Sequence, residues 1–176
     1  MGDRIGDRKL FRRVRLPEAV AGRLYLHSMP GRFEPLEASF AEAARLGIDR
    51  IVCLVPPEEI EAASPSYAQA IEEGRLPCDR ETFSIPDFGV PEDRRAFAGL
   101  VSSTASRIQE GERVLVHCHA GIGRTGTFAT CVLLALGLSA AEAENAIREA
   151  GSQPEILAQR QLINWFKENM LRPPGT

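Results

Sequence analysis

The chain has 176 residues, of which 44% are hydrophobic and 26% are charged. This length suffices for one globular domain with its own apolar core, and the composition excludes wholesale disorder. The net charge of −3 disfavours a general nucleic-acid binder, and no apolar run reaches the ~18 residues of a membrane span.

The first 16 residues are strongly basic. Six lysine and arginine side chains stand against two aspartates, a local charge of +4 that leaves −7 for the other 160 residues. We expect a basic N-terminal arm over residues 1–16, either solvated or in contact with acidic partners or an anionic membrane. The arm lacks the apolar core of a signal peptide.

Strands and helices are predicted to alternate along the chain. Apolar runs predict strands at 24–26, 51–55, 82–85 and 114–116. Helical spacing predicts helices over 35–46, 64–73, 92–110, 127–136, 139–150 and about 154–170. Ser139 and Glu142 form a capping-box pattern at the start of one of them. The alternation indicates an α/β fold, a single three-layer domain with a mostly parallel sheet of about four to five strands flanked by helices.

The four cysteines are expected to be free thiols. Cys53, Cys78, Cys118 and Cys131 show no CxxC spacing, and the chain has no secretory segment. This pattern is typical of a reducing compartment and predicts a cytoplasmic location.

The segment 114–127 carries the chemistry. A predicted strand leads into His117-Cys118-His119-Ala120-Gly121-Ile122-Gly123-Arg124-Thr125-Gly126, which leads into an apolar helix. Loops of this kind turn successive N–H groups toward one point, and the helix N-terminus adds partial positive charge. Gly121 and Gly123 permit the tight backbone path. The segment therefore predicts an anion site.

Cys118 and Arg124 make this anion site reactive. The local field favours a thiolate at Cys118, and a thiolate beneath a bound phosphate is placed to attack phosphorus. The planar guanidinium of Arg124 can grip two oxygens of a tetrahedral oxyanion.

Three other uses of such a loop fit this sequence poorly. The GxxxxGK[ST] pattern is absent because the loop has no lysine, and the glycines lack the GxGxxG spacing of a dinucleotide-binding turn. The adjacent His117, Cys118 and His119 cannot easily converge on one zinc ion, and no second ligand pair follows.

These residues resemble the His-Cys-x5-Arg-Thr signature loop of the cysteine-dependent protein tyrosine phosphatase superfamily. Residues 85–91, Ile-Pro-Asp-Phe-Gly-Val-Pro, are similar to the loop that carries the family's general acid. The layout from Leu24 to about Phe166 resembles the compact dual-specificity branch, of the cyclin-dependent-kinase-associated phosphatase type. The resemblance implies the phosphotyrosine phosphatase II-like fold and a phosphatase domain over residues 17–172.

The resemblance also implies a role for each site residue. Cys118 is the nucleophile, and Asp87 protonates the leaving oxygen and then takes a proton from the second-step water. Thr125 is expected to hydrogen-bond the cysteine sulfur, and His117 is expected to order the loop through backbone contacts. Arg124 holds the phosphoryl oxygens together with the rest of the substrate-binding loop, His119, Ala120, Gly121, Ile122 and Gly123. The scheme needs no metal or other cofactor.

Two assignments have competitors. Asp93 is the fallback acid, although it fits better as the cap of the next helix. Gln159 resembles the family's glutamine that orients the second-step water, and Gln153 and Gln161 compete for this role. A solvated helix face is the alternative reading for each glutamine.

Cys53 suggests a redox hypothesis. It lies in a predicted strand that we expect beside the strand leading to Cys118, and a nearby thiol can trap an oxidised thiolate as a disulfide. The alternative is a plain buried core cysteine.

We expect a monomeric phosphate-monoester hydrolase that acts on phosphotyrosine in proteins, and also on phosphoserine and phosphothreonine, through a cysteinyl-phosphate intermediate. The alternatives are a phosphatase of a phosphoinositide, an inositol phosphate or an RNA 5′-phosphate, a catalytically silent phosphate-binding module, and a rhodanese-type sulfurtransferase. Asp87 argues against an RNA triphosphatase, the absence of loop lysines argues against a phosphoinositide enzyme, and Arg124-Thr125 argues against a sulfurtransferase.

Overall fold

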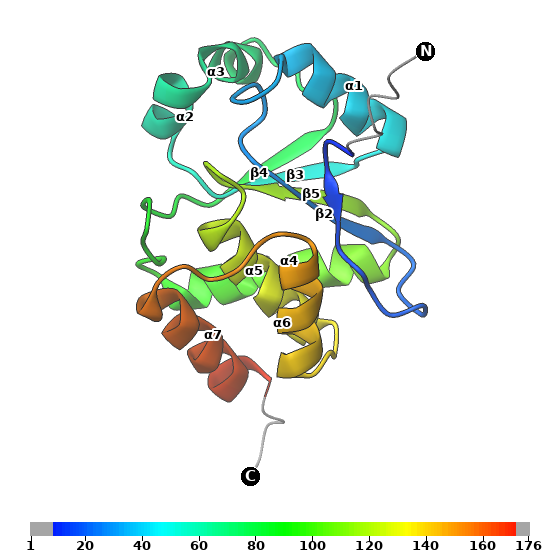
Figure 1. Ribbon diagram of the computed structural model, residues 1–176, viewed down its shortest axis with the longest axis vertical. Coiled ribbons are helices and arrows are strands. Elements are labelled where there is room, and N and C mark those ends of the chain that lie inside the picture. The colour runs from blue at the N-terminus through cyan, green and yellow to red at the C-terminus, as the bar shows by residue number, and fades with distance from the viewer. Residues whose placement is uncertain (1–8, 172–176) are drawn as a thin grey trace, which may run out of the picture.

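A five-stranded sheet forms the middle layer of the computed structural model, which describes residues 9–171 (Figure 1). The strand order is β1-β2-β5-β3-β4; β1 and β2 are antiparallel, and the other neighbours are parallel. The strands are β1 (Arg12–Arg13), β2 (Arg23–His27), β3 (Arg50–Cys53), β4 (Asp79–Thr82) and β5 (Arg113–His117).

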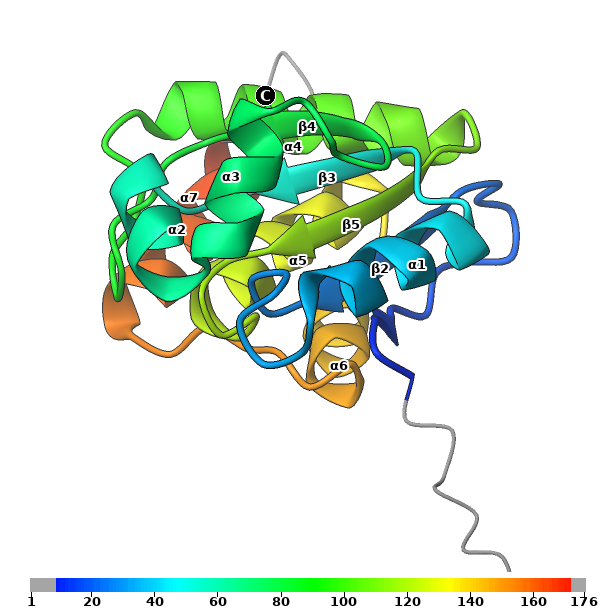
Figure 2. The same ribbon diagram turned by 90° about the horizontal axis from the view of Figure 1, so that it is seen from above.

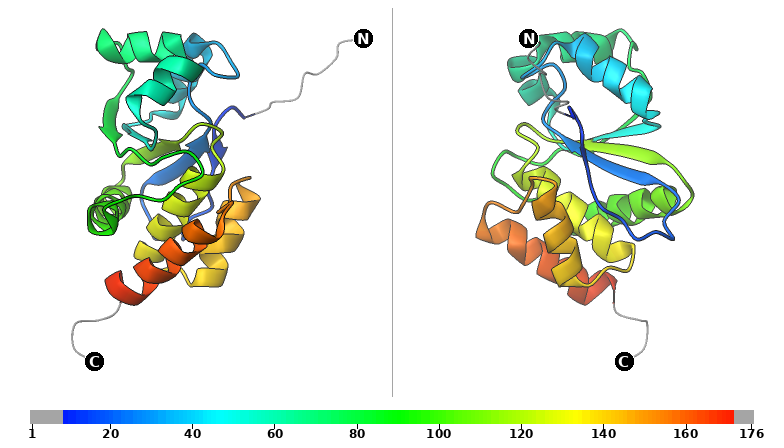
Figure 3. Two further views of the ribbon diagram at one scale, coloured as in Figure 1. Left: turned by 90° about the vertical axis from the view of Figure 1, so that its left-hand side faces the viewer. Right: turned by 45° about the vertical axis from the view of Figure 1, so that its right-hand side comes forward.

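Seven helices of the described residues cover the two faces of the sheet. Helices α1 to α3 lie on one face and α4 to α7 on the other (Figures 1 and 3). They are α1 (Leu36–Leu46), α2 (Pro57–Ala63), α3 (Pro65–Glu72), α4 (Arg94–Gln109), α5 (Gly123–Ala135), α6 (Ala140–Glu149) and α7 (Leu157–Met170). The three-layer α/β domain and its mostly parallel sheet are therefore confirmed.

Strand β5 lies in the middle of the sheet, and both of its faces are buried. Val114 and Val116 pack into one apolar cluster, whereas Leu115 packs into another, because successive side chains of a strand point to opposite faces. Both neighbouring strands run parallel to it, and the common direction of β3 and β5 is visible from above (Figure 2). The carboxyl ends of these strands therefore meet at one edge of the sheet.

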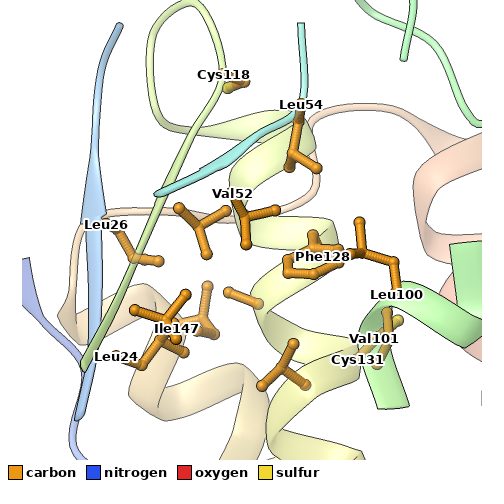
Figure 4. Packing of buried hydrophobic residues seen from close by; sticks show 14 of the residues in the cluster. Leu24, Leu26, Val52, Leu54, Leu100, Val101, Cys118, Phe128, Cys131 and Ile147 are labelled. Carbon is orange, nitrogen blue, oxygen red and sulfur yellow. The ribbon is translucent and has the colours of Figure 1, made fainter. Parts of the chain in front are cut away.

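Helix α5 is almost wholly buried against this sheet. Leu24, Leu26 and Val52 project from the strands toward Phe128 on α5 (Figure 4). Helix α5 also contacts α4, α6 and α7, so it forms the centre of the larger core. A helix buried on nearly all sides requires an almost continuous apolar sequence, which explains the run 128–136.

Several element boundaries differ from the sequence prediction. Helix α2 was not predicted; it begins with proline at its first position and has two acidic residues in its first turn. Strand β4 is Asp79–Thr82 and not 82–85, because these four polar residues are the ones that pair with Arg50–Cys53 of β3 at the edge of the sheet. Helix α5 begins four residues earlier than expected, and α7 begins at Leu157, three residues after Pro154.

The described part of the basic N-terminal segment belongs to the sheet. Arg12 and Arg13 pair with β2, and the flanking Phe11 and Val14 are buried. Residues 11–14 are therefore packed, which the expectation of a solvated arm did not foresee. Residues 1–8 of that expected arm lie outside the described residues.

No helix within residues 9–171 is long and apolar enough to cross a membrane.

Candidate active site

The loop after β5 lies at the edge where the parallel strands end. It connects His117, the last residue of β5, to Gly123, the first residue of α5. Gly121 has a φ of 73°, and a Cβ there would lie 2.3 Å from the carbonyl oxygen of His27. Only glycine fits this position, because a side chain would meet both backbone strain and a fixed backbone atom.

Four backbone N–H groups of this loop are unpaired in the described part of the chain. Within residues 9–171, no hydrogen-bond acceptor is paired with the backbone N–H of residues 119–122. The first N–H groups of a helix also lack partners inside the helix, and α5 begins at Gly123. A run of unpaired donors beside a helix N-terminus provides the anion cradle that the sequence predicts.

A cavity of about 320 Å³ opens over the loop. It is lined by seven residues of the expected site and by three that the sequence reading did not include. The expected residues are Asp87, Cys118, His119, Ala120, Gly123, Arg124 and Gln159, and the additional ones are Arg32, Phe88 and Glu155. The two motifs, 31 positions apart from Asp87 to Cys118, therefore meet in one pocket.

Arg124 is held by two carboxylates and one carbonyl. Its Nη1 and Nη2 donate to the two carboxylate oxygens of Glu59 at 2.9 and 2.7 Å. Nη1 also donates to the carbonyl of Ile85 at 2.9 Å, and Nη2 lies 3.0 Å from Oδ1 of Asp87. Burial lowers the pKa of Arg124, but hydrogen bonding to Glu59 and the nearby charges of Cys118, Glu59 and Asp87 raise the pKa above its ordinary value.

Glu59 is a site residue that sequence reasoning missed. It lies on the unpredicted helix α2, and its side chain is only 17% exposed. Nδ1 of His119 also lies 3.1 Å from its Oε1, although outside hydrogen-bond geometry. The available signal was the acidic first turn after Pro56 and Pro57, but nothing in the sequence connects that turn to Arg124.

Asp87 lies at the exposed side of the pocket. Its side chain is 56% exposed and accepts a hydrogen bond from the N–H of Phe88, whose φ of 49° marks a sharp turn. Asp93 instead caps α4 by accepting from the N–H groups of Arg95 and Ala96. The capping reading of Asp93 is confirmed, and Asp93 does not line the cavity.

His117 and Thr125 are both buried beneath the loop. Nδ1 of His117 lies 3.1 Å from the carbonyl oxygen of Cys118, and its Nε2 lies 3.1 Å from the hydroxyl of the buried Tyr67. Burial raises the pKa of Tyr67, so its hydroxyl keeps its proton. The hydroxyl of Thr125 has no hydrogen-bond partner within residues 9–171, so the expected bond to the sulfur of Cys118 is absent from this conformation.

Gln159 lies in the pocket and not on a solvated helix face. Its side chain is 1% exposed, accepts from the N–H of Glu155 at 2.8 Å and donates to the carbonyl of Gly89 at 3.3 Å. Gln153 and Gln161 are exposed, and neither lines the cavity. The solvated-face reading is therefore wrong for Gln159.

Cys53 lies one strand away from the loop. It is buried, and it is the register partner of His117 across β3 and β5, so the expected neighbourhood of the two strands is confirmed. Burial raises the pKa of Cys53, but the interactions with His117, the carbonyl of Val55 and Arg80 together lower the pKa below its ordinary value. All four cysteines are free thiols, and a disulfide between Cys53 and Cys118 stays a prediction.

No metal-binding cluster of three or more His, Cys, Asp or Glu side chains occurs in the described part of the chain.

The geometry agrees with a comparison against protein families. A family model described as "Swiss Army Knife protein, DSP-PTPase phosphatase domain" matches residues 20–173. The chain therefore belongs to this family of dual-specificity-type protein tyrosine phosphatase domains.

Solved structures share the fold, and one relative is similar over part of the sequence. The fold is similar to the crystal structure of kinase associated phosphatase (KAP) with its catalytic-site cysteine replaced by serine, with a TM-score of 0.78, 17% identity and coverage of 93% of this chain and 96% of that one. The structure of Tk-PTP in its active form gives a TM-score of 0.67 and 26% identity over 87% of this chain and 99% of that one. Tyrosine-protein phosphatase 1 of Dictyostelium discoideum is 39% identical over 56 residues, which span 28% of this chain but only 11% of that relative.

Proposed function

We propose that the protein is a cytoplasmic phosphatase of phosphorylated proteins, acting on phosphotyrosine and also on phosphoserine and phosphothreonine. One observation carries the proposal: Cys118, Arg124 and Asp87 line one cavity above a loop of unpaired N–H groups. That arrangement supplies a nucleophile, an oxyanion clamp and a proton donor for phosphate-monoester hydrolysis.

In the first step, the thiolate of Cys118 attacks phosphorus. The S–P bond forms while the P–O bond to the substrate breaks, and protonated Asp87 gives its proton to the leaving oxygen. Arg124 and the loop N–H groups hold the equatorial oxygens, where negative charge is spread in the transition state. Asp87 is in contact with the guanidinium of Arg124. A bound phosphate can therefore take the place of Asp87 as a partner of that guanidinium.

In the second step, water attacks the cysteinyl-phosphate. The new P–O bond forms as the S–P bond breaks, and Asp87 accepts the proton of the water. Gln159, buried at the same cavity, supports this step because its amide can orient that water. A rotation of the buried hydroxyl of Thr125 toward the departing sulfur would give the hydroxyl the partner that it lacks.

The rim of the pocket supports a protein phosphomonoester over a polyanionic lipid. Phe88 lines the cavity and is exposed. The exposed Phe33 does not line the cavity itself, but its ring lies under the guanidinium of the lining Arg32, 4.1 Å from the ring centre. Exposed aromatic side chains favour contact with an aryl phosphate. The lining residues include two arginines, Arg32 and Arg124, and two acidic residues, Asp87 and Glu155, so the cavity lacks the excess of positive charge that favours ligands with several phosphates.

The test is phosphate release from p-nitrophenyl phosphate without added metal. We expect turnover by the parent protein and none by Cys118→Ser. Asp87→Asn should lose the basic limb of the pH–rate profile, while the control Asp93→Asn should keep it. Equal activity of the parent and Cys118→Ser, or an inactive parent, would refute the mechanism, and an unchanged profile for Asp87→Asn would refute the assignment of the acid to Asp87.

Substrate class is tested with one panel of phosphopeptides, phosphoinositides and inositol phosphates. We expect the highest kcat/KM on phosphotyrosine peptides. A higher kcat/KM on a phosphoinositide or an inositol phosphate would contradict the proposed protein substrate and identify that class as the substrate instead.

A further inference from the structure

We propose that Arg12, on strand β1, is a positioning residue of the loop 118–124: it holds the carbonyl of Gly121 outward so that the following N–H faces the bound phosphate. This inference rests on the proposed function, because it concerns the same site. Nothing in the sequence connects a residue of the basic N-terminal segment to a loop more than a hundred positions away.

The guanidinium of Arg12 binds the back of the loop directly. Its Nη2 donates to the carbonyl oxygen of Gly121 at 2.6 Å. Its Nη1 donates to the carbonyls of Ala150 and Gly151 at 2.9 and 2.6 Å and lies 3.2 Å from the hydroxyl of Ser152. Arg12 therefore joins the active-site loop to the segment between α6 and α7.

Ser152 reinforces the same carbonyl. Its side chain is buried, and its hydroxyl donates to the carbonyl oxygen of Gly121 at 2.5 Å. Both lone-pair sites of that oxygen are thus occupied from outside the loop. A carbonyl with two donors, one of them charged, has little freedom to rotate.

The orientation of this carbonyl fixes the next N–H. The described residues contain no cis peptide bond, and in a trans peptide the C=O and the following N–H point in opposite directions. A Gly121 carbonyl held on the outer side therefore turns the N–H of Ile122 to the inner side. That N–H has no hydrogen-bond partner within residues 9–171, so it is available to a phosphate oxygen.

Glycine makes the anchoring necessary. Gly121 has a φ of 73° and no side chain to restrict its peptide planes, so rotation of the 121–122 peptide costs little without external contacts. The carbonyl of His119 is anchored in the same manner, by the N–H of Met29 and by Arg32, each at 3.1 Å. The loop is therefore oriented from outside at two of its carbonyls.

The charge of Arg12 also acts on the site. Burial lowers the pKa of Arg12, and its attraction to Cys118 opposes this lowering. An arginine remains protonated through such a shift, so a fixed positive charge stands behind the nucleophile. This interaction adds to the geometric role but is not needed for it.

The experiment compares Arg12→Met, Arg12→Lys and Ser152→Ala with Arg13→Met, a matched control on the exposed neighbouring residue of β1. The measurements are kcat and KM for p-nitrophenyl phosphate and the affinity for inorganic phosphate by calorimetry, below the melting temperature of each variant. We expect Arg12→Met to lower kcat/KM and phosphate affinity about tenfold, because the N–H of Ile122 would no longer be held toward the phosphate and one oxyanion donor would be lost. Arg12→Lys should recover part of this loss, Ser152→Ala should show a smaller loss, and Arg13→Met should match the parent.

A purely structural role would give a different result. If folded Arg12→Met has a lower melting temperature but the phosphate affinity and kcat/KM of the parent, the proposal is overturned. If Arg12→Met does not fold, Arg12→Lys and Ser152→Ala decide, and parental phosphate affinity in both would overturn it. An inactive parent would refute the proposed function alone, because phosphate affinity still reports on Arg12.

Discussion

Arg124 is a buried cation with two carboxylate partners of different character. The carboxylate of Glu59 is 17% exposed and binds both terminal nitrogens, whereas that of Asp87 is 56% exposed and binds one. Breaking a buried pair on one side leaves an uncompensated charge, which is costly. We therefore expect Glu59 to stay with Arg124 throughout turnover, while the exposed Asp87 yields its place to the phosphate.

Glu59→Gln tests this division of roles. The amide keeps the shape of the carboxylate but offers one acceptor oxygen, so Arg124 loses half of its bidentate contact and its fixed orientation. We expect kcat/KM for p-nitrophenyl phosphate to fall about tenfold or more, since small misplacements of a charge clamp are costly in the transition state.

The matched control for Glu59 is Glu58→Gln on the same turn of α2, where the side chain is exposed. This variant should keep the parental kcat/KM. Equal losses in both variants would mean that the charge of α2, and not the contact with Arg124, matters.

The sequence predicts residues that lie within contiguous motifs. Cys118, Arg124 and Asp87 can be assigned to the candidate site from the sequence because one loop and one short turn contain them. Glu59 and Arg12 were not found, because each reaches the site through tertiary packing of an element that has no recognisable local pattern. Spacing in the sequence describes a loop, but not the side chains that orient it from other elements.

At the scale of elements, α5 couples the active-site loop to the segment between α6 and α7. Gly126 is on the first turns of α5, and a Cβ there would lie 2.6 Å from the backbone nitrogen of Gln153. The contact is between the backbone of α5 and the backbone at Gln153, and neither can move aside as a flexible side chain can. Ser152 precedes Gln153 in the chain and Gln159 follows it. The close approach at Gln153 therefore keeps both side chains near the active-site loop.

Gly126→Ala should therefore destabilise the fold. We expect about 1–3 kcal/mol from the forced displacement, measured by urea unfolding. Gly99→Ala is the matched control: it is an exposed helical glycine of α4, and a Cβ there meets nothing within 4 Å. That variant should gain up to about 1 kcal/mol from helix propensity. Stabilisation by both substitutions would contradict the packing argument.

Elements with continuous apolar patterns were predicted well, and short polar ones were not. The buried strands β3 and β5 and the capping box of Ser139 and Glu142 match the sequence reading. The two-residue β1 and the polar β4 exist because the sheet edge offers them partners. Local propensity does not report such tertiary pairing, since it depends on where the neighbouring strand lies.

For the whole molecule, we expect a monomer. The large exposed apolar side chains of the described residues are few, namely Phe33, Phe88, Leu157, Met170 and Leu171. Obligate dimers bury large and more hydrophobic surfaces. Light scattering after size exclusion should give a mass near 19.3 kDa at micromolar concentration. A mass near twice this value, unchanged on dilution, would contradict the expectation.

The anchoring of Gly121 by Arg12 has a consequence for the order of folding. Arg12 lies 109 positions before Gly121 and 138 positions before Ala150, so these bonds close most of the chain into a single loop. Contacts of such separation form late, after the entropy of loop closure has been overcome. During synthesis, Cys118 leaves the ribosome before Ser152 and Gln159 do. We therefore expect catalytic competence to arise late in folding, so that a nascent chain carries the proposed nucleophile before the proposed oxyanion site is complete.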